Sequence, residues 1–234
     1  MAAMDDLEEK QRRLEELEEE KISVEKDLLE KATALSEKRQ QVSRDLEREM
    51  EKELKNLHMD GTRFKVSFID HTGNGEKRGI FSVDDITDDG FDRIEFLISP
   101  NIGEELRPLT KIASGGELSR IMLALKTILA RTASVETIIF DEVDSGISGA
   151  TAEVVGKKLL SLSEFHQILC ITHLPQIASQ GRTHFLVRKS VSDGRTTAEI
   201  SELSPESRVQ EIARLLGGSE ITLKALDHAK EMLG

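Results

Sequence analysis

Several residues in the second half of the sequence have types and spacing suited to phosphate chemistry. Ser114-Gly115-Gly116-Glu117 opens an apolar helix pattern, and its S-x-x-E spacing is typical of a capping box with Ser114 as the N-cap. Two glycines in a first turn cost helix stability, up to about 1 kcal/mol each, but they leave backbone N–H groups open to close approach. Such a helix end favours phosphate, although a purely structural cap would give the same pattern.

Acidic residues follow a short apolar run. The predicted strand "TIIFDE" ends in Asp141 and Glu142, and the next apolar run, "QILCIT", is followed directly by His173. Carboxylates at a strand end suit a Mg²⁺ ligand and a base that orients water, as in a Walker B strand. An ordinary acidic strand end and a surface histidine are the plain alternatives. In open parallel sheets ligands sit beyond the carboxyl ends of strands, which favours the functional interpretation.

The elements that would position these residues alternate between strand and helix. Residues 137–142 ("TIIFDE") and the apolar run 167–172 ("QILCIT") read as buried strands, and the amphipathic helix between them predicts a parallel pair with a right-handed crossover. Residues 63–69 and 91–99 read as further strands, separated by the turn-rich "HTGNGEKRG". Residues 183–203 predict a hairpin turning at Asp193-Gly194, and two closing helices follow, the second with Ser219 as N-cap. The predicted fold class is therefore α/β.

The first region, residues 1–57, has a different character. It contains no Gly or Pro, and a seven-residue apolar repeat runs through Leu7, Leu14, Leu28, Leu35 and Val42, with Lys21 at the one position of the repeat that is not apolar. This seam predicts half of a coiled-coil arm, since the stripe is too narrow to form a core; an isolated charged helix is the alternative. We expect residues 58–234 to form a separate compact domain.

Composition narrows the functional class. The 234 residues carry a formal net charge of -12, so contact with DNA would need a local basic patch or a partner. Cys170, the single cysteine, suits a small core position in a reducing compartment. No apolar run approaches the ~20 residues of a membrane span. These features predict a cytoplasmic protein without a membrane partner. Arg107, Lys111 and Arg120 flank the glycine-containing helix. We expect them to be solvated charges; contact with nucleotide or DNA is the alternative.

Together these motifs resemble the carboxyl-terminal half of an ABC-type ATPase head of the SMC-like class. "ASGGELSR" is similar to the ABC signature, "IIFDE" to Walker B, "VDSG" to the D-loop and "ITHLPQIAS" to the switch-histidine segment. The stretch "GFDRIEFLISPNIGEELRPLTK" narrows the resemblance to a family of bacterial DNA repair proteins within that class. The resemblance implies the C-terminal lobe of a P-loop ATPase head, with parallel strands and flanking helices, preceded by the returning helix of a coiled-coil arm.

The resemblance also implies roles for individual residues. Asp141 would support Mg²⁺, Glu142 would activate the attacking water, and His173 would contact the γ-phosphate of ATP. Asp144 would communicate across a dimer of heads. The signature residues would bind the γ-phosphate of an ATP held by a second head; they are Ser114, Gly115, Gly116 and Glu117. In such a family the whole protein acts on DNA double-strand breaks and associates with the nucleoid.

One motif of such an ATPase is missing. The sequence has no G-x-x-x-x-G-K-[ST] phosphate loop. The resemblance therefore implies a fragment whose ATPase would be completed by the N-terminal half of the same protein, and we expect the chain alone to be nearly inactive. The alternative is a non-enzymatic coiled-coil dimerisation or scaffold module with an incomplete nucleotide-binding domain.

Overall fold

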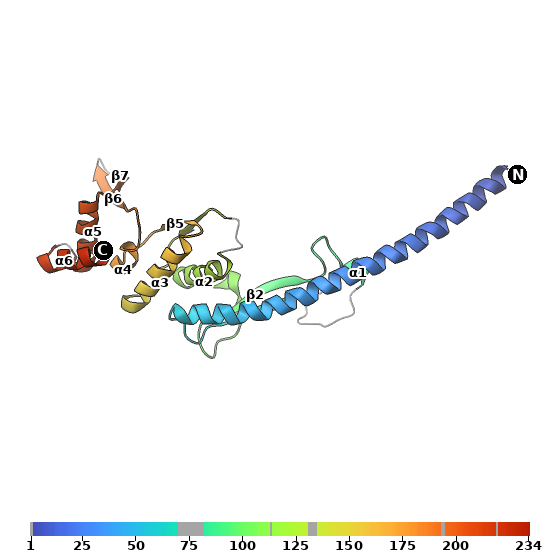
Figure 1. The fold of residues 1–234 in the computed structure, drawn as a ribbon, viewed down its shortest axis with the longest axis horizontal. Coiled ribbons are helices and arrows are strands. Elements are labelled where there is room, and N and C mark those ends of the chain that lie inside the picture. Colours follow the sequence, from blue (N-terminus) through green and yellow to red (C-terminus); the bar gives the residue numbers. More distant parts are fainter. Residues whose placement is uncertain (1, 70–81, 113, 131–134, 193–194, 219) are drawn as a thin grey trace. The chain divides into compact units, whose positions relative to one another are not determined.

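The computed structural model describes residues 2–69, 82–112, 114–130, 135–192, 195–218 and 220–234. It confirms the α/β class, with a parallel strand pair, flanking helices and a long N-terminal helix (Figure 1). The chain divides into two compact units. The first contains residues 1–49 and 64–98, and the second contains residues 50–63 and 99–234. The predicted domain boundary between residues 57 and 58 stays a prediction.

Most of helix α1 (Ala2–Asn56) belongs to the first unit. One face bears small buried residues, Ala32, Ser36 and Ser43, which lie at helical spacing and let other backbone approach closely. The heptad positions Leu7, Leu14, Leu28, Leu35 and Val42 are exposed. These exposed apolar side chains are open to a partner helix.

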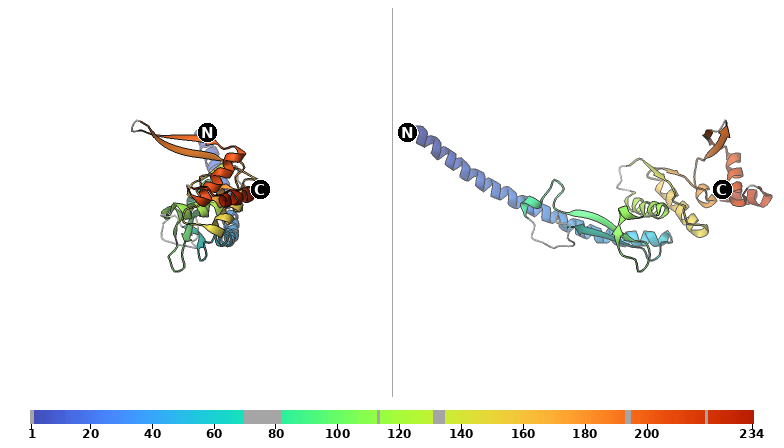
Figure 2. Two further views of the ribbon diagram at one scale, coloured as in Figure 1. Left: turned by 90° about the vertical axis from the view of Figure 1, so that its left-hand side faces the viewer. Right: turned by 180° about the vertical axis from the view of Figure 1, so that it is seen from behind.

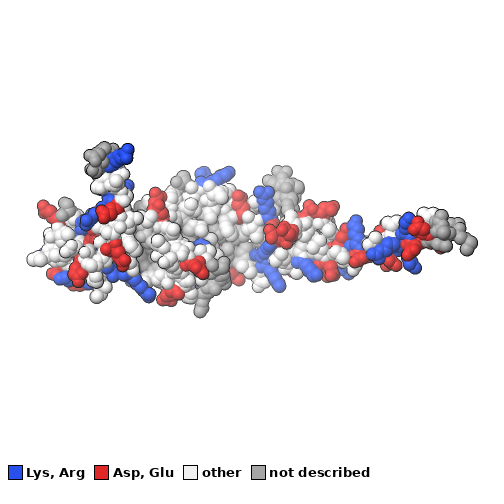
Figure 3. Space-filling model, turned by 90° about the horizontal axis from the view of Figure 1, so that it is seen from above, with Lys and Arg blue, Asp and Glu red and all other residues white. Residues whose placement is uncertain are grey.

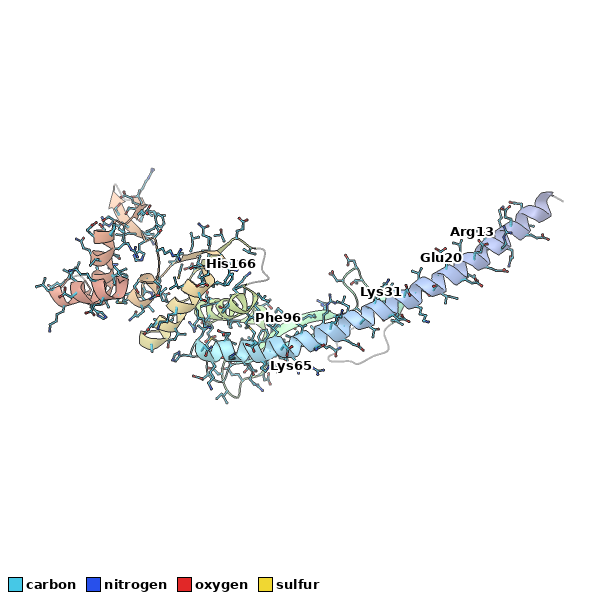
Figure 4. The ribbon with its side chains drawn as sticks, viewed as in Figure 1. Arg13, Glu20, Lys31, Lys65, Phe96 and His166 are labelled. Carbon is cyan, nitrogen blue, oxygen red and sulfur yellow. The ribbon has the colours of Figure 1, made fainter. Side chains whose placement is uncertain are left out.

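The exposed face of α1 is otherwise highly charged. Lys, Arg, Asp and Glu side chains are interspersed along it (Figure 3). Arg13, Glu20 and Lys31 project from the helix (Figure 4), and Lys10 pairs with Asp6 one turn away, at 2.7 Å. Such exposed i,i+4 pairs contribute only a few tenths of a kcal/mol each, so they favour the helix without building a core.

Two strands pack in this first unit. Strands β1 (Arg63–Ile69) and β2 (Arg93–Ser99) are neighbours in one sheet, and the rings of Phe64 and Phe96 lie 5.5 Å apart. Asp92, just before β2, accepts hydrogen bonds from Ser36 at 2.7 Å and Arg39 at 3.1 Å on α1. These two hydrogen bonds fix the position of β2 along α1. The loop "HTGNGEKRG" lies outside the described residues.

The second unit holds the predicted parallel pair. Strands β4 (Thr137–Phe140) and β5 (Gln167–Cys170) pair in parallel, with Phe140 opposite Cys170. The helix between them is α3 (Gly149–Leu162), and α2 (Gly115–Leu129) contacts α3 (Figures 1 and 2). Ile121, Leu123 and Val155 are fully buried and make up the core here.

Three short elements also precede α2. They are the 3₁₀ helix η1 (Val83–Asp85) in the first unit, and β3 (Arg107–Pro108) and the 3₁₀ helix η2 (Leu109–Lys111) in the second. After β5 come α4 (Pro175–Ala178) and the antiparallel hairpin of β6 (Phe185–Ser192) and β7 (Arg195–Glu202). Helices α5 (Pro205–Gly217) and α6 (Leu223–Leu233) then pack around Ile212, Ala213 and Ala229.

Two predictions about these elements are wrong. The parallel strands are not buried on both faces: Ile139 is 67% exposed and Leu169 46%, because no described element covers that face of the two-stranded sheet. Helix α6 begins later than predicted, with Thr222 as N-cap accepting from the Ala225 N–H at 3.2 Å. Ser219 and the hairpin turn 193–194 lie outside the described residues.

The described helices include none that combines the length and apolarity needed to cross a lipid bilayer.

Candidate active site at the carboxyl end of the parallel strands

The structure brings the predicted acidic residues and the histidine to one edge of the sheet. Phe140 and Cys170 are opposite each other in the parallel register, and the Ile171 N–H donates to the Phe140 carbonyl at 3.0 Å. Asp141 and Glu142 follow the first strand, and His173 follows the second. The side chains of all three reach solvent. The edge therefore presents two carboxylates and an imidazole, as the strand order predicted.

The N-terminus of α2 lies at the same edge. Ser114 is the N-cap, and its hydroxyl accepts from the Glu117 N–H at 3.3 Å, which confirms the predicted cap. Each glycine also has a neighbour in its own chain. A Cβ on Gly115 would overlap the carboxylate of Glu142, and a Cβ on Gly116 would lie 2.9 Å from the Ser145 carbonyl oxygen. The glycines thus allow the loop after β4 to approach the helix end.

Glu142 has an unusual backbone conformation. Its φ is 58°, in the left-handed region, and among the described residues only His58 shares this feature without being glycine. Such a conformation costs of order 1 kcal/mol or more and persists where surrounding structure imposes it, which is common at functional sites. Here it turns the Glu142 carboxylate onto the first turn of α2, where the helix dipole favours a negative charge.

Two side chains of α2 hold the loop after β4 in this position. The Ser119 hydroxyl donates to the Asp141 carbonyl at 2.7 Å, and an Arg120 Nη1–H donates to the Ser145 carbonyl at 2.7 Å. Arg120 is only 8% exposed, so its assignment as a solvated charge is wrong. Burial lowers the pKa of the Arg120 guanidinium, and the nearby Glu117 carboxylate partly offsets this. Arg107 and Lys111 are exposed, as predicted.

Asp144 lies on the inner side of the loop. It is 5% exposed, and one carboxylate oxygen, Oδ2, accepts from the Thr172 hydroxyl at 2.6 Å and from the His173 backbone N–H at 2.9 Å. The His173 ring nitrogen Nδ1 lies 3.0 Å from the same oxygen. Asp144 therefore ties the loop after β4 to the segment after β5.

Asp144 and Asp141 also affect the pKa of the nearby Cys170 thiol. Burial, reinforced by the charges of Asp144 and Asp141, raises the pKa of Cys170 to about 12. A thiol held protonated in this way is a poor nucleophile. Cys170 is only partly buried and is not among the buried core residues, so the predicted core position is not confirmed.

The acidic pair has the right chemistry for magnesium. Asp141 and Glu142 supply hard carboxylate oxygens that reach solvent, and Mg²⁺ is usually held by one or two carboxylates together with substrate phosphates. Within the described ranges no three His, Cys, Asp or Glu side chains cluster closely enough to hold a metal ion by themselves. The remaining ligands would come from water or from substrate phosphates.

Sequence comparisons find relatives named DNA repair protein RecN. It is 41% identical to DNA repair protein RecN of Bacillus subtilis over 233 residues, which cover 98% of this chain and 40% of that protein. It is 45% identical to RecN of Haemophilus influenzae over 202 residues, covering 86% of this chain and 34% of that protein. The chain belongs to the RecN family. It matches a C-terminal RecN portion, as the motifs predicted.

The match to RecN is strong in sequence but partial in length. RecN of Xylella fastidiosa is 51% identical over 144 residues, which cover 62% of this chain and 26% of that protein. The chain thus spans about 40% or less of the curated RecN proteins described here. No protein-family model matches it.

Solved structures similar to this chain include SMC heads. The Smc head domain with a coiled coil and joint from Pyrococcus yayanosii aligns with a TM-score of 0.47 and 17% identity, over 79% of this chain and 29% of that one. The SMC head domain from Thermotoga maritima aligns with a TM-score of 0.31 and 25% identity, over 47% of this chain and 39% of that one.

Three features of the site were not predicted from the sequence. They are the contact of Glu142 with Gly115, the anchoring by Ser119 and Arg120, and the pairing of Asp144 with the 172–173 segment. The spacing of Ser119 and Arg120, one helical turn after the glycines, was the available signal. It places both side chains near the helix start, where a neighbouring loop could be bound.

Proposed function

We propose that this chain is the part of a DNA repair ATPase of the RecN family that supplies the signature helix, the Walker B carboxylates and the switch histidine. The carrying observation is that Asp141, Glu142 and His173 emerge from two paired parallel strands beside the N-terminus of α2. An ATP-binding head needs a metal ligand, a base and phosphate contacts at one edge, and this arrangement offers all three.

Each residue has a role that its position supports. Asp141, at the strand end and with its backbone fixed by Ser119, would hold Mg²⁺, which would neutralise phosphate charge. Glu142 would accept a proton from the attacking water, and His173 would donate to the γ-phosphate. Ser114 and the amides of Gly115, Gly116 and Glu117 would bind the γ-phosphate of an ATP held by a second head.

The open edge of α2 is consistent with this role in trans. Ser114 and Gly115 are exposed, so a phosphate carried by another molecule could reach them. The Glu142 carboxylate occupies the space beside Gly115, and it would have to rotate away when a phosphate binds there, since two anions would repel. Binding at α2 would thus free Glu142 to serve as base.

The partners follow from what this chain lacks. A chain with the phosphate loop, the N-terminal half of the same protein in our proposal, would complete the nucleotide site. The exposed seam of α1 would pair with another helix of the arm. DNA would be bound by the complete, nucleoid-associated cytoplasmic protein rather than by this acidic chain alone.

Reconstitution tests the proposal. The chain is mixed with a polypeptide that contains the remaining, phosphate-loop part of its RecN protein, and magnesium-dependent ATP turnover is measured against each part alone. Turnover should appear only in the mixture. Glu142→Gln should lower it at least about 100-fold while ATP still binds, because it removes the base and keeps the shape. Turnover at the parent rate in Glu142→Gln would refute the assigned role.

A scaffold function is the second candidate. The exposed seam from Leu7 to Val42 favours it, since dimerisation through α1 needs no ATP. Association of the two parts without turnover would support the scaffold and refute the ATPase.

A further inference from the structure

The Asp144 carboxylate is the centre of a compact polar cluster. Its Oδ2 atom lies within 3.0 Å of the Thr172 hydroxyl, the His173 backbone nitrogen and the His173 ring nitrogen Nδ1. The Asp144 side chain is 6% exposed, whereas the His173 side chain is 72% exposed. A buried carboxylate therefore holds an exposed imidazole by one of its two nitrogens.

This contact has a consequence for the state of the imidazole. An ionised carboxylate can only accept hydrogen bonds, so the nitrogen that faces it must carry a proton. In a neutral imidazole one nitrogen is a donor and the other an acceptor, and the hydrogen bond made by one sets the state of the other. With Nδ1 protonated, Nε2 is the atom left for external contacts.

The rest of the cluster keeps the carboxylate in place. The Thr172 hydroxyl and the His173 N–H both donate to it, and the Leu174 N–H donates to the Thr172 hydroxyl at 3.1 Å. These bonds involve the backbone of the segment that follows β5. They hold Asp144 beneath the ring independently of where the ring points, so the acceptor is ready whenever Nδ1 approaches.

We propose that Asp144 is a positioning residue for His173, selecting the Nδ1–H tautomer and turning Nε2 outward. This role lies within one chain, unlike the contact across a head dimer that the D-loop resemblance implies. For the reaction, the inference rests on the proposed function: an imidazolium can donate from Nδ1 to Asp144 and from Nε2 to a phosphate oxygen together. The tautomer itself does not depend on ATP.

Nitrogen NMR on the unsubstituted chain gives the first test. The chain is labelled with ¹⁵N-histidine and studied at alkaline pH, where imidazoles are neutral. The His173 signals are identified by their loss in His173→Gln. We expect a protonated Nδ1 and an unprotonated Nε2 at His173. A protonated Nε2 with an unprotonated Nδ1 would overturn the proposal without any need for a variant of Asp144.

Variants then test the cause. In Asp144→Ala, checked for folding by circular dichroism, His173 should lose its single tautomer and give averaged signals like those of the exposed His58 and His228. Thr172→Val is the matched control, since it removes one bond to the carboxylate but leaves the ring contact, and its His173 tautomer should be unchanged. An unchanged spectrum in folded Asp144→Ala, or an equal change in Thr172→Val, would overturn the proposal.

A kinetic cycle tests the link to catalysis in the reconstituted ATPase. Asp144→Ala and His173→Gln should each lower turnover at least about tenfold, and the double variant should be no slower than His173→Gln. Independent, multiplied losses would overturn the positioning role. Absence of turnover in every mixture would refute the proposed ATPase function, and the tautomer measurement would still decide the role of Asp144.

Discussion

Replacing Gly116 by alanine tests the close approach between α2 and the loop after β4. The new Cβ would lie 2.8 Å from the Ser145 Cβ and 2.9 Å from the Ser145 carbonyl oxygen. That carbonyl cannot move freely, because it accepts the hydrogen bond from Arg120 at 2.7 Å. Overpacking typically costs about 1–3 kcal/mol, while alanine regains up to about 1 kcal/mol of helix propensity. We expect a net loss of about 1–2 kcal/mol.

Gly115→Ala is the matched control. Its Cβ would meet the carboxylate of Glu142, which is the far end of an exposed, flexible side chain and can rotate into solvent. The free energy of unfolding should therefore change by less than about 0.5 kcal/mol, or rise because alanine favours the helix. The two substitutions are chemically identical and differ only in what the methyl group meets.

Urea unfolding followed by circular dichroism measures both effects. The midpoint for Gly116→Ala should lie clearly below that of the unsubstituted chain, and the midpoint for Gly115→Ala should not. Equal midpoints for the two variants would refute the packing argument, and the glycines would then serve only an external ligand. A large loss in Gly115→Ala alone would show that the Glu142 carboxylate is essential to the fold.

The remaining predictions concern the Cys170 thiol and the mostly buried ion pair of Lys158 and Glu53. At pH 8 Cys170 should react with iodoacetamide roughly a thousandfold more slowly in the folded chain than in urea, since its pKa is raised to about 12; equal rates would refute the burial argument. Lys158→Met should lower the free energy of unfolding by about 1–2 kcal/mol, because Lys158 pairs with Glu53 at 2.5 Å where both side chains are mostly buried. Lys157→Met removes an exposed pair with Glu153 and should cost less than about 0.5 kcal/mol; equal losses would contradict the role of burial.

Much of the fold could be predicted because its signals are local. The heptad seam and the absence of Gly and Pro predicted α1, and the alternation of apolar runs with an amphipathic segment predicted the parallel pair of β4 and β5. The N-cap at Ser114 follows from residues three positions apart. Such features depend on a few neighbouring side chains, so the sequence pattern carries them directly.

The rest depends on contacts between distant residues. Asp144 meets residues 28 and 29 positions away, and Arg120 meets a carbonyl 25 positions away. No local pattern distinguishes a buried arginine that binds a loop carbonyl from a solvated one on the same helix. Likewise, the burial of Ala32, Ser36 and Ser43 could not be predicted from the sequence, because alanine and serine do not stand out in a hydrophobic pattern.

The loop from Asp141 to Ser145 is held from two sides, which bears on how the site could respond to a phosphate. α2 binds its first and last carbonyls through Ser119 and Arg120, and the segment after β5 binds its middle through Asp144. A shift of α2 would therefore pull on the loop that carries Glu142 and, through Asp144, on His173. A phosphate that displaces the Glu142 carboxylate from Gly115 acts on the same loop. Glu142, the proposed base, and His173, the proposed hydrogen-bond donor to the phosphate, would therefore respond together.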